Sequence, residues 1–208
     1  MAFAVVESGS IKSMPPGNKG IQIGDIKYPS DIFTTKWTES ERNAIGVYTV
    51  EENNTNWKNP YWYINTDMSF AYDASSNKVK GTYGTATAKP IADVLYTQAD
   101  EDNGLGTKDD IKEKHLKTIL KENLDGQCKA LLQPSDYMAI KAAEGITMNS
   151  GWKTWRANVR TKCNSMQTQI DNAANVDALA ALYVYVNTAD EGEPEVLARP
   201  LGEFPVKG

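Results

Sequence analysis

The sequence of 208 residues predicts an α+β fold, and two observations support this prediction. Up to about residue 98, aromatic and β-branched residues gather in short runs between turn segments, a pattern typical of strands. From Ile111 onward, apolar residues recur at three- and four-residue steps, as in amphipathic helices. Because strands come first and helices second, we expect an α+β protein: a small antiparallel β domain, then a helical-hairpin bundle and an irregular proline-containing tail.

Four segments are expected along the chain. Residues 1–98 form a β-rich domain with one short helix, 99–110 an acidic linker with glycines, 111–186 the helical domain and 187–208 an extended tail. The linker is placed where the apolar spacing changes. The tail contains Pro194, Pro200 and Pro205, so we expect it to lack regular structure and to lie along a surface or to await a partner.

In the β domain, the alternating isoleucines of 20–28 around Gly24-Asp25 predict a hairpin. Thr38 and Glu41 have the spacing of a capping box, which predicts a short helix ending near Ile45 at Gly46. Extended runs follow at 47–50 and 60–65. A second hairpin is expected from 70–72 and 78–83, which flank Ser75-Ser76-Asn77.

In the helical domain, the apolar stripe from Ile111 predicts a helix that ends before Pro134. Ser135 or Asp136 is expected to cap a second helix over 137–144, ended by Gly145. The third helix, starting near Ser150, has the most regular stripe, formed by Trp152, Trp155, Val159, Cys163, Met166 and Ile170. A short fourth helix is expected after Asn175.

Composition excludes several classes of function. With 22 basic and 27 acidic residues the chain carries a net charge of −5, which disfavours a nucleic-acid partner. The longest uncharged apolar run, 178–186, is far shorter than the ~20 residues of a bilayer span, so no membrane insertion is expected. The first residues lack the features of a signal peptide. Cys128 and Cys163 alone do not indicate a disulfide framework, and a reducing compartment fits.

We expect no catalytic, cofactor-binding or metal-binding residues, and no enzymatic activity. His115 is the single histidine, and no nucleophile motif or phosphate-binding glycine loop accompanies it. In the acidic run 100–104 glycine comes fifth rather than sixth, so the calcium-loop pattern fails. Cys128 and Cys163 fall on apolar stripes, where a thiol behaves as a small hydrophobic group. No carboxylate pair can be assigned to glycoside hydrolysis.

Two groups of residues are candidates for binding or structure. Exposed aromatic rings stack on sugars or anchor protein interfaces, and the candidates for such an interface are Trp57, Tyr61, Trp62 and Tyr63. In a strand Trp62 would share one face with Ile64, and Tyr61 would share the other with Tyr63, so packing of one face in the core is the alternative. Arg156 and Arg160 are expected to pair with Asp136 and Glu144 across the helical hairpin, rather than to grip single-stranded nucleic acid with Lys153.

The stretch LLQPSDYMAIKAAEGITMNSGWKTWRANVR, residues 131–160, resembles the small helical domain of tailed-bacteriophage tail-fibre and tail-fibre-assembly proteins. The family's pattern is matched by Leu131, Leu132, Ser135, Asp136, Tyr137, Lys141, Glu144, Trp155, Arg156 and Arg160, and Trp152 belongs to the same structural motif. Tyr137 stands where tryptophan is usual and Lys141 where arginine is usual, and lysine lacks the two-pronged geometry of arginine. IGDIKYPSDIFTTKWTESERNAIGVYTV, residues 23–50, is similar to the openings of phage structural proteins.

The resemblance implies a non-enzymatic structural component of a tailed-phage virion, made in the host cytoplasm and located in the tail or its fibres. It would act in assembly and attachment through protein–protein interfaces, as a homo-oligomer with other virion proteins as partners and a host-surface glycan as a further candidate. A tail-fibre assembly chaperone that leaves the mature particle is the first alternative. A carbohydrate-binding module that acts on the host surface is the second.

Overall fold

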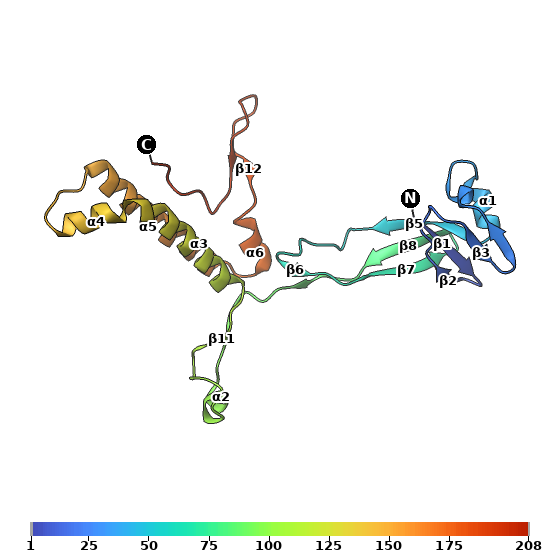
Figure 1. Cartoon of the computed structure of the whole chain (residues 1–208), viewed down its shortest axis with the longest axis horizontal. Helices are drawn as coiled ribbons and strands as arrows, with labels where there is room; N and C mark the ends of the chain where they lie inside the picture. The colour runs from blue at the N-terminus through green and yellow to red at the C-terminus, as the bar shows by residue number, and fades with distance from the viewer. Residues whose placement is uncertain (1, 208) are drawn as a thin grey trace. The chain divides into compact units, whose positions relative to one another are not determined.

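The computed structural model describes residues 2–207, and the chain forms two compact units that meet between Thr87 and Ala88 (Figure 1). Both strands and helices are present, so the predicted α+β class is confirmed. The first unit contains β1 (Ala2–Glu7), β2 (Ser10–Ser13), β3 (Ile21–Ile23), β4 (Ile26–Tyr28), the 3-10 helix η1 (Ser30–Phe33), α1 (Glu39–Ala44), β5 (Val47–Asn53), β6 (Tyr63–Ile64), β7 (Met68–Asp73) and β8 (Lys78–Tyr83). β9 (Thr87–Ala88) lies at the boundary.

The second unit contains two long helices together with several short elements. These elements are β10 (Val94–Leu95), α2 (Gln98–Asp102), β11 (Ile111–Glu113), α3 (Leu116–Leu132), the 3-10 helix η2 (Gln133–Ser135), α4 (Asp136–Ala143), α5 (Ser150–Asn172), α6 (Val176–Ala181), β12 (Val186–Asn187) and β13 (Leu197–Ala198).

A five-stranded sheet in the order β2-β1-β5-β8-β7 organises the first unit. Most neighbours are antiparallel, but β5 and β8 run parallel, with Val50 opposite Val79. The expected purely antiparallel sheet was therefore wrong in this detail. β7 occupies the edge and β8 inserts beside β5, and the long connection over 54–77 permits this parallel pairing. Turn residues predict pairing only between strands that follow each other in sequence, so they could not predict the pairing of β5 with β8.

β1 lies outside the predicted strands, because its apolar run Phe3-Ala4-Val5-Val6 shows no alternation. Both of its faces are buried, which removes the usual polar-outward pattern. Phe3 and Val5 pack with Ile32 and Val47 on one face. Ala4 and Val6 pack with Val50 and Val79 on the other. The sheet of this unit thus has a buried apolar cluster on each of its two faces.

The predicted local signals of the first unit are largely confirmed. Thr38 Oγ1 accepts the Glu41 N–H at 3.2 Å and the Glu41 carboxylate accepts the Thr38 N–H at 2.7 Å, which forms the capping box of α1. These hydrogen bonds from the Thr38 N–H and hydroxyl hold the pKa of Glu41 below its usual value. Gly46, just after α1, takes a φ of +81°, and a Cβ there would meet the Val6 carbonyl oxygen at 2.8 Å. β3 with β4 and β7 with β8 form the two expected hairpins.

α3 and α5 pack along each other and form the core of the second unit (Figure 1). The predicted stripe of α5 is buried from Val159 to Ile170, whereas Trp152 and Trp155 are half-buried. From α3 the buried residues are Leu116, Leu120, Leu124 and Cys128. Asn175 Oδ1 caps α6 by accepting the Ala178 N–H at 2.9 Å, as predicted.

Three predicted boundaries in the second unit were wrong. α3 begins at Leu116 rather than Ile111, because 111–113 pairs with β10 as strand β11. The segment 99–110 is not a linker: it contains most of α2, it lies between those paired strands, and the two units separate at residue 87 instead. The acidic composition of this segment reflects a surface-exposed helix and turn rather than a domain boundary.

The tail is more regular than predicted. β12 and β13 pair as a short antiparallel ribbon within the region expected to lack secondary structure, with Val186 opposite Ala198. Beyond the ribbon, Leu201 is fully buried and its N–H donates to the Leu182 carbonyl at 3.0 Å. Of the two arrangements expected for the tail, this part of the chain therefore lies along its own unit rather than awaiting a partner.

Candidate interaction surfaces

Arg156 is the centre of the structure formed by residues 131–160. It is only 5% exposed, and its Nη1 donates to the Leu132 carbonyl at 2.7 Å and to the Ser135 hydroxyl at 2.5 Å. Its Nη2 donates to Asp136 Oδ1 at 2.7 Å. Because Leu132, Ser135 and Asp136 lie where α3 passes through η2 into α4, one guanidinium fixes that junction against α5.

The predicted pairing of Arg156 with Asp136 is present, but the predicted partner of Arg160 is not. Among residues 2–207 neither Glu144 nor Arg160 forms an ion pair at hydrogen-bonding distance, and both side chains are exposed. Arg156 lies between the helices, whereas Arg160, one turn further along α5, faces solvent. The predicted capping of α4 also differs, since the Ser135 hydroxyl donates to the Leu132 carbonyl at 2.9 Å instead of accepting from the helix.

The two tryptophans of the motif hold the end of the chain. Trp155 Nε1 donates to the Pro205 carbonyl at 2.9 Å, and its ring meets Trp152 edge to face at 5.5 Å. The Lys207 ammonium lies 5.0 Å from the centre of the Trp152 ring. The tail therefore covers part of both rings. The apolar spacing of α5 did not predict this contact.

Two hollows flank Thr147 and Met148, between α4 and α5. One has a volume of about 340 Å³ and the other about 400 Å³. We define the α4–α5 groove by six residues that line them: Met138, Ile146, Met148, Trp152, Lys153 and Arg160. Met138, Ile146, Met148 and Trp152 supply apolar lining, whereas Lys153 and Arg160 supply positive charge. The groove therefore suits a ligand segment that combines apolar side chains with acidic groups.

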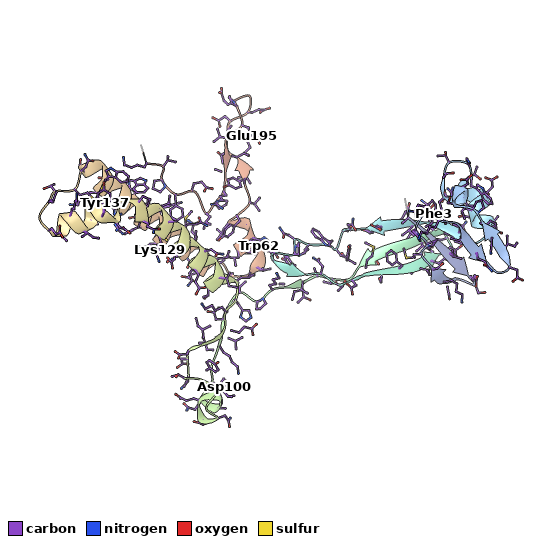
Figure 2. All side chains as sticks on the ribbon, viewed as in Figure 1. Phe3, Trp62, Asp100, Lys129, Tyr137 and Glu195 are labelled. Atoms are coloured by element: carbon purple, nitrogen blue, oxygen red, sulfur yellow. The ribbon has the colours of Figure 1, made fainter. Side chains whose placement is uncertain are left out.

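α4 adds exposed apolar surface beside the groove. It has no fully buried residue, and Tyr137 and Ile140 are more than half exposed. Figure 2 shows the Tyr137 side chain on α4. The Lys141 ammonium lies 5.7 Å from the centre of the Tyr137 ring. Tyr137 and Lys141 thus contact each other at this surface.

A second exposed apolar surface lies on the segment 184–198, which we call the ribbon. About half of each apolar side chain is exposed at Val184, Tyr185, Val186, Val196 and Leu197. This surface was not predicted from the sequence. The run Tyr183-Val184-Tyr185-Val186 carried the signal, because consecutive aromatic and β-branched residues favour a strand over a helix.

The aromatic candidates of the first unit do not form one surface. Trp57 and Tyr61 are each 47% exposed, whereas Trp62 and Tyr63 are each 8% exposed. The predicted alternation of faces was wrong, because strand β6 starts only at Tyr63 and residues 60–62 form a turn. In that turn Asn59 Oδ1 accepts the Tyr61 N–H at 2.9 Å. Trp57 and Tyr61 remain as exposed rings.

The reactive side chains of the second unit are used in packing and capping. Burial raises the pKa of the Cys163 thiol to about 12, and the neighbouring Cys128 and Asp125 add to the effect. The backbone N–H of His115 and the hydroxyl of Thr118 donate to the Asp93 carboxylate at 2.7 and 2.6 Å, which caps the start of α3. Burial opposes the charge of Asp93, but these hydrogen bonds outweigh it and lower its pKa.

The first three residues of the acidic run 100–104 lie in α2, where Asp100 accepts from Thr97 and pairs with Lys112 at 2.7 Å. Within residues 2–207, no group of three or more histidine, cysteine or carboxylate side chains has an arrangement that could hold a metal ion. No helix of the described chain is both long and apolar enough to span a bilayer.

Comparisons of the chain with models of known families, with curated proteins and with solved structures gave no significant match.

Proposed function

We propose that the chain is a non-enzymatic structural component of a tailed-phage virion, located in the tail or its fibres, and that it acts in assembly and attachment through protein–protein interfaces. The resemblance of residues 131–160 and 23–50 to phage structural proteins supports the phage assignment. Their order along the chain adds to that support.

The observation that carries the proposal is the use of the motif residues as a scaffold. Asp136 and Arg156 join α4 to α5, and Trp155 binds the tail. Each of these side chains is occupied by a contact within the chain, which suits a structural role. What this scaffold leaves exposed is apolar surface, on α4 and on the ribbon. Large, partly apolar surfaces of this kind are typical of protein interfaces.

Mass spectrometry of purified particles tests the proposal. We expect the chain in washed virions at a constant ratio to the other tail proteins. A chain that is abundant in infected cells but absent from virions would contradict a structural role and favour the assembly chaperone instead.

Trp57 and Tyr61 favour one second candidate, a carbohydrate-binding module, because exposed rings can stack on sugars. Titration of the purified chain with host-surface polysaccharide, followed by tryptophan fluorescence, tests it. A saturable change that disappears in Trp57→Ala but persists in Trp152→Ala would support glycan binding by the first unit. Under the structural proposal we expect the same absence of saturable change in the wild-type chain and in both variants.

A further inference from the structure

The ribbon exposes more apolar surface than a pair of such short strands can support alone. β12 and β13 pair at two positions, and a hydrogen bond from the Thr188 N–H to the Val196 carbonyl at 2.8 Å extends the ribbon. Two-stranded ribbons of this length are marginally stable in water. Val186 and Leu197 nevertheless remain about half exposed. Burial of these side chains against another surface would stabilise the ribbon, so the ribbon is suited to be one half of an interface.

The tip of the ribbon is acidic. Residues 188–196 contain four carboxylates and no basic residue: Asp190, Glu191, Glu193 and Glu195. None of the four forms an ion pair within the part of the chain that the structure describes. Figure 2 shows Glu195 on the ribbon. Ribbon and tip together present an apolar base followed by concentrated negative charge.

The α4–α5 groove has the opposite character in a chain that is acidic as a whole. Residues 136–160 contain four basic and two acidic residues, whereas the net charge of the chain is −5. One of the two acids, Asp136, is neutralised by Arg156. Lys153 and Arg160 are exposed and form no ion pair among residues 2–207. The apolar lining of the groove, with Ile146 and Trp152, completes the complementarity to the ribbon.

We propose that the ribbon of one copy of this chain binds in the α4–α5 groove of a second copy. The ribbon's apolar side chains would contact the apolar lining of the groove, and the acidic tip would face Lys153 and Arg160. In the structure Lys207 of the chain end lines one hollow, but no ribbon residue lines either, so the groove is not occupied by the ribbon of the same copy. Such a contact joins two different surfaces, and it therefore builds a closed ring or a chain of subunits. The proposal concerns self-association alone and holds whether or not the chain belongs to a virion.

Sedimentation velocity of the full-length chain with two charge-reversal variants tests the proposal. The groove variant carries Lys153→Glu and Arg160→Glu. The tip variant carries Asp190→Lys, Glu191→Lys, Glu193→Lys and Glu195→Lys. We expect wild type to self-associate with rising concentration and less so at high salt. Each variant alone should associate at least about tenfold more weakly, because like charges then meet at the contact.

Mixing the two variants gives the decisive result. The acidic groove of one variant then meets the basic tip of the other, so the mixture should regain association that neither variant shows alone. A control with Lys19→Glu and Lys27→Glu changes the net charge as the groove variant does, at exposed sites of the first unit, and should associate like wild type. Circular dichroism confirms that the variants fold.

The proposal is overturned by a wild-type chain that stays monomeric throughout the concentration series, by variants that associate as strongly as wild type, or by a mixture that regains no association. Loss of association in the Lys19 and Lys27 control to the same extent as in the groove variant would also overturn it, because general charge rather than the groove would then be responsible.

Discussion

The two units of the chain differ in how completely their apolar side chains are buried. In the first, β1 is covered on both faces, and its neighbours Val47 and Val79 are fully buried. In the second, α3 and α5 bury the apolar side chains along the line where they contact each other, which we call the α3–α5 seam. α4 and the ribbon leave apolar side chains exposed. Substitutions in the first kind of region should cost stability. Substitutions in the second kind should cost association and leave folding intact.

Each unit also has a buried arginine, Arg42 in the first and Arg156 in the second. Arg42 of the first unit donates to the Trp37 carbonyl at 2.6 Å, and its guanidinium lies 5.2 Å from the centre of the Phe3 ring. It therefore packs against the core of the first unit. Arg156 of the second unit holds the junction from which α4 projects. Arg42 thus stabilises the packing of a core, whereas Arg156 stabilises the position of the exposed helix α4.

The largest effect on stability is expected at the α3–α5 seam. Ile170→Ala removes a fully buried side chain and should lower the free energy of unfolding by about 2–5 kcal/mol. Leu197→Ala on the ribbon, where the side chain is 57% exposed, should change it by less than about 0.5 kcal/mol. Urea denaturation measures both. Equal losses would contradict the distinction between a buried seam and an exposed ribbon.

The next effect is expected at the α4 junction. Arg156→Leu should lower the free energy of unfolding by about 1–3 kcal/mol, because the buried Ser135 hydroxyl and the Leu132 carbonyl each lose a hydrogen bond from the guanidinium and keep only the one between them. Arg156→Lys should recover little, since an ammonium cannot reproduce the guanidinium geometry. Arg160→Leu is the matched control and should have almost no effect. Thermal melts that rank Arg160→Leu equal to Arg156→Leu would refute the assignment.

A smaller effect is expected where the tail meets α5. Trp155→Phe retains an aromatic ring but removes the hydrogen bond to the Pro205 carbonyl, at a cost of about 1 kcal/mol. The chain end should then exchange its amide hydrogens faster, while the α3–α5 seam stays protected. Hydrogen exchange read by mass spectrometry resolves the two regions. Unchanged exchange near Pro205 would show that another contact holds the tail.

The smallest effect concerns protonation in α2. The Lys112 ammonium, followed by the Thr97 N–H and hydroxyl, lowers the pKa of Asp100 to about 2. Since the folded pKa lies below the unfolded value, the stabilising contribution is present above about pH 4 and is lost as pH falls through 2. Lys112→Met should raise the Asp100 pKa measured by NMR titration. An unchanged midpoint would contradict the ion pair.

Local signals predicted local structure well. The Thr38 capping box, the turn at Gly24 and the stripe from Val159 to Ile170 each depend on residues close in sequence, and each is confirmed. The parallel pairing of β5 with β8 and the start of α3 at Leu116 depend on partners distant in sequence. Those parts could not be predicted from periodicity.

The contacts of the candidate site also fall into those that the sequence predicts and those that depend on residues distant in sequence. Arg156 with Asp136 was predictable, because the two residues lie on consecutive helices of one hairpin. Ser135 as a partner of Arg156, and Pro205 as the acceptor of Trp155, depend on how the chain turns at η2 and where the tail lies. Exposure of Arg160, one turn beyond Arg156, follows from its position around α5, which the predicted pairing with Glu144 overlooked.

The proposed role in a tailed-phage virion is tested most directly by a density map of the assembled particle, obtained by electron microscopy. If the chain works through its surfaces, the map will show the chain in the tail or its fibres, with the ribbon and the α4–α5 groove covered by protein. A particle without the chain, or one in which both surfaces face solvent, would contradict the account.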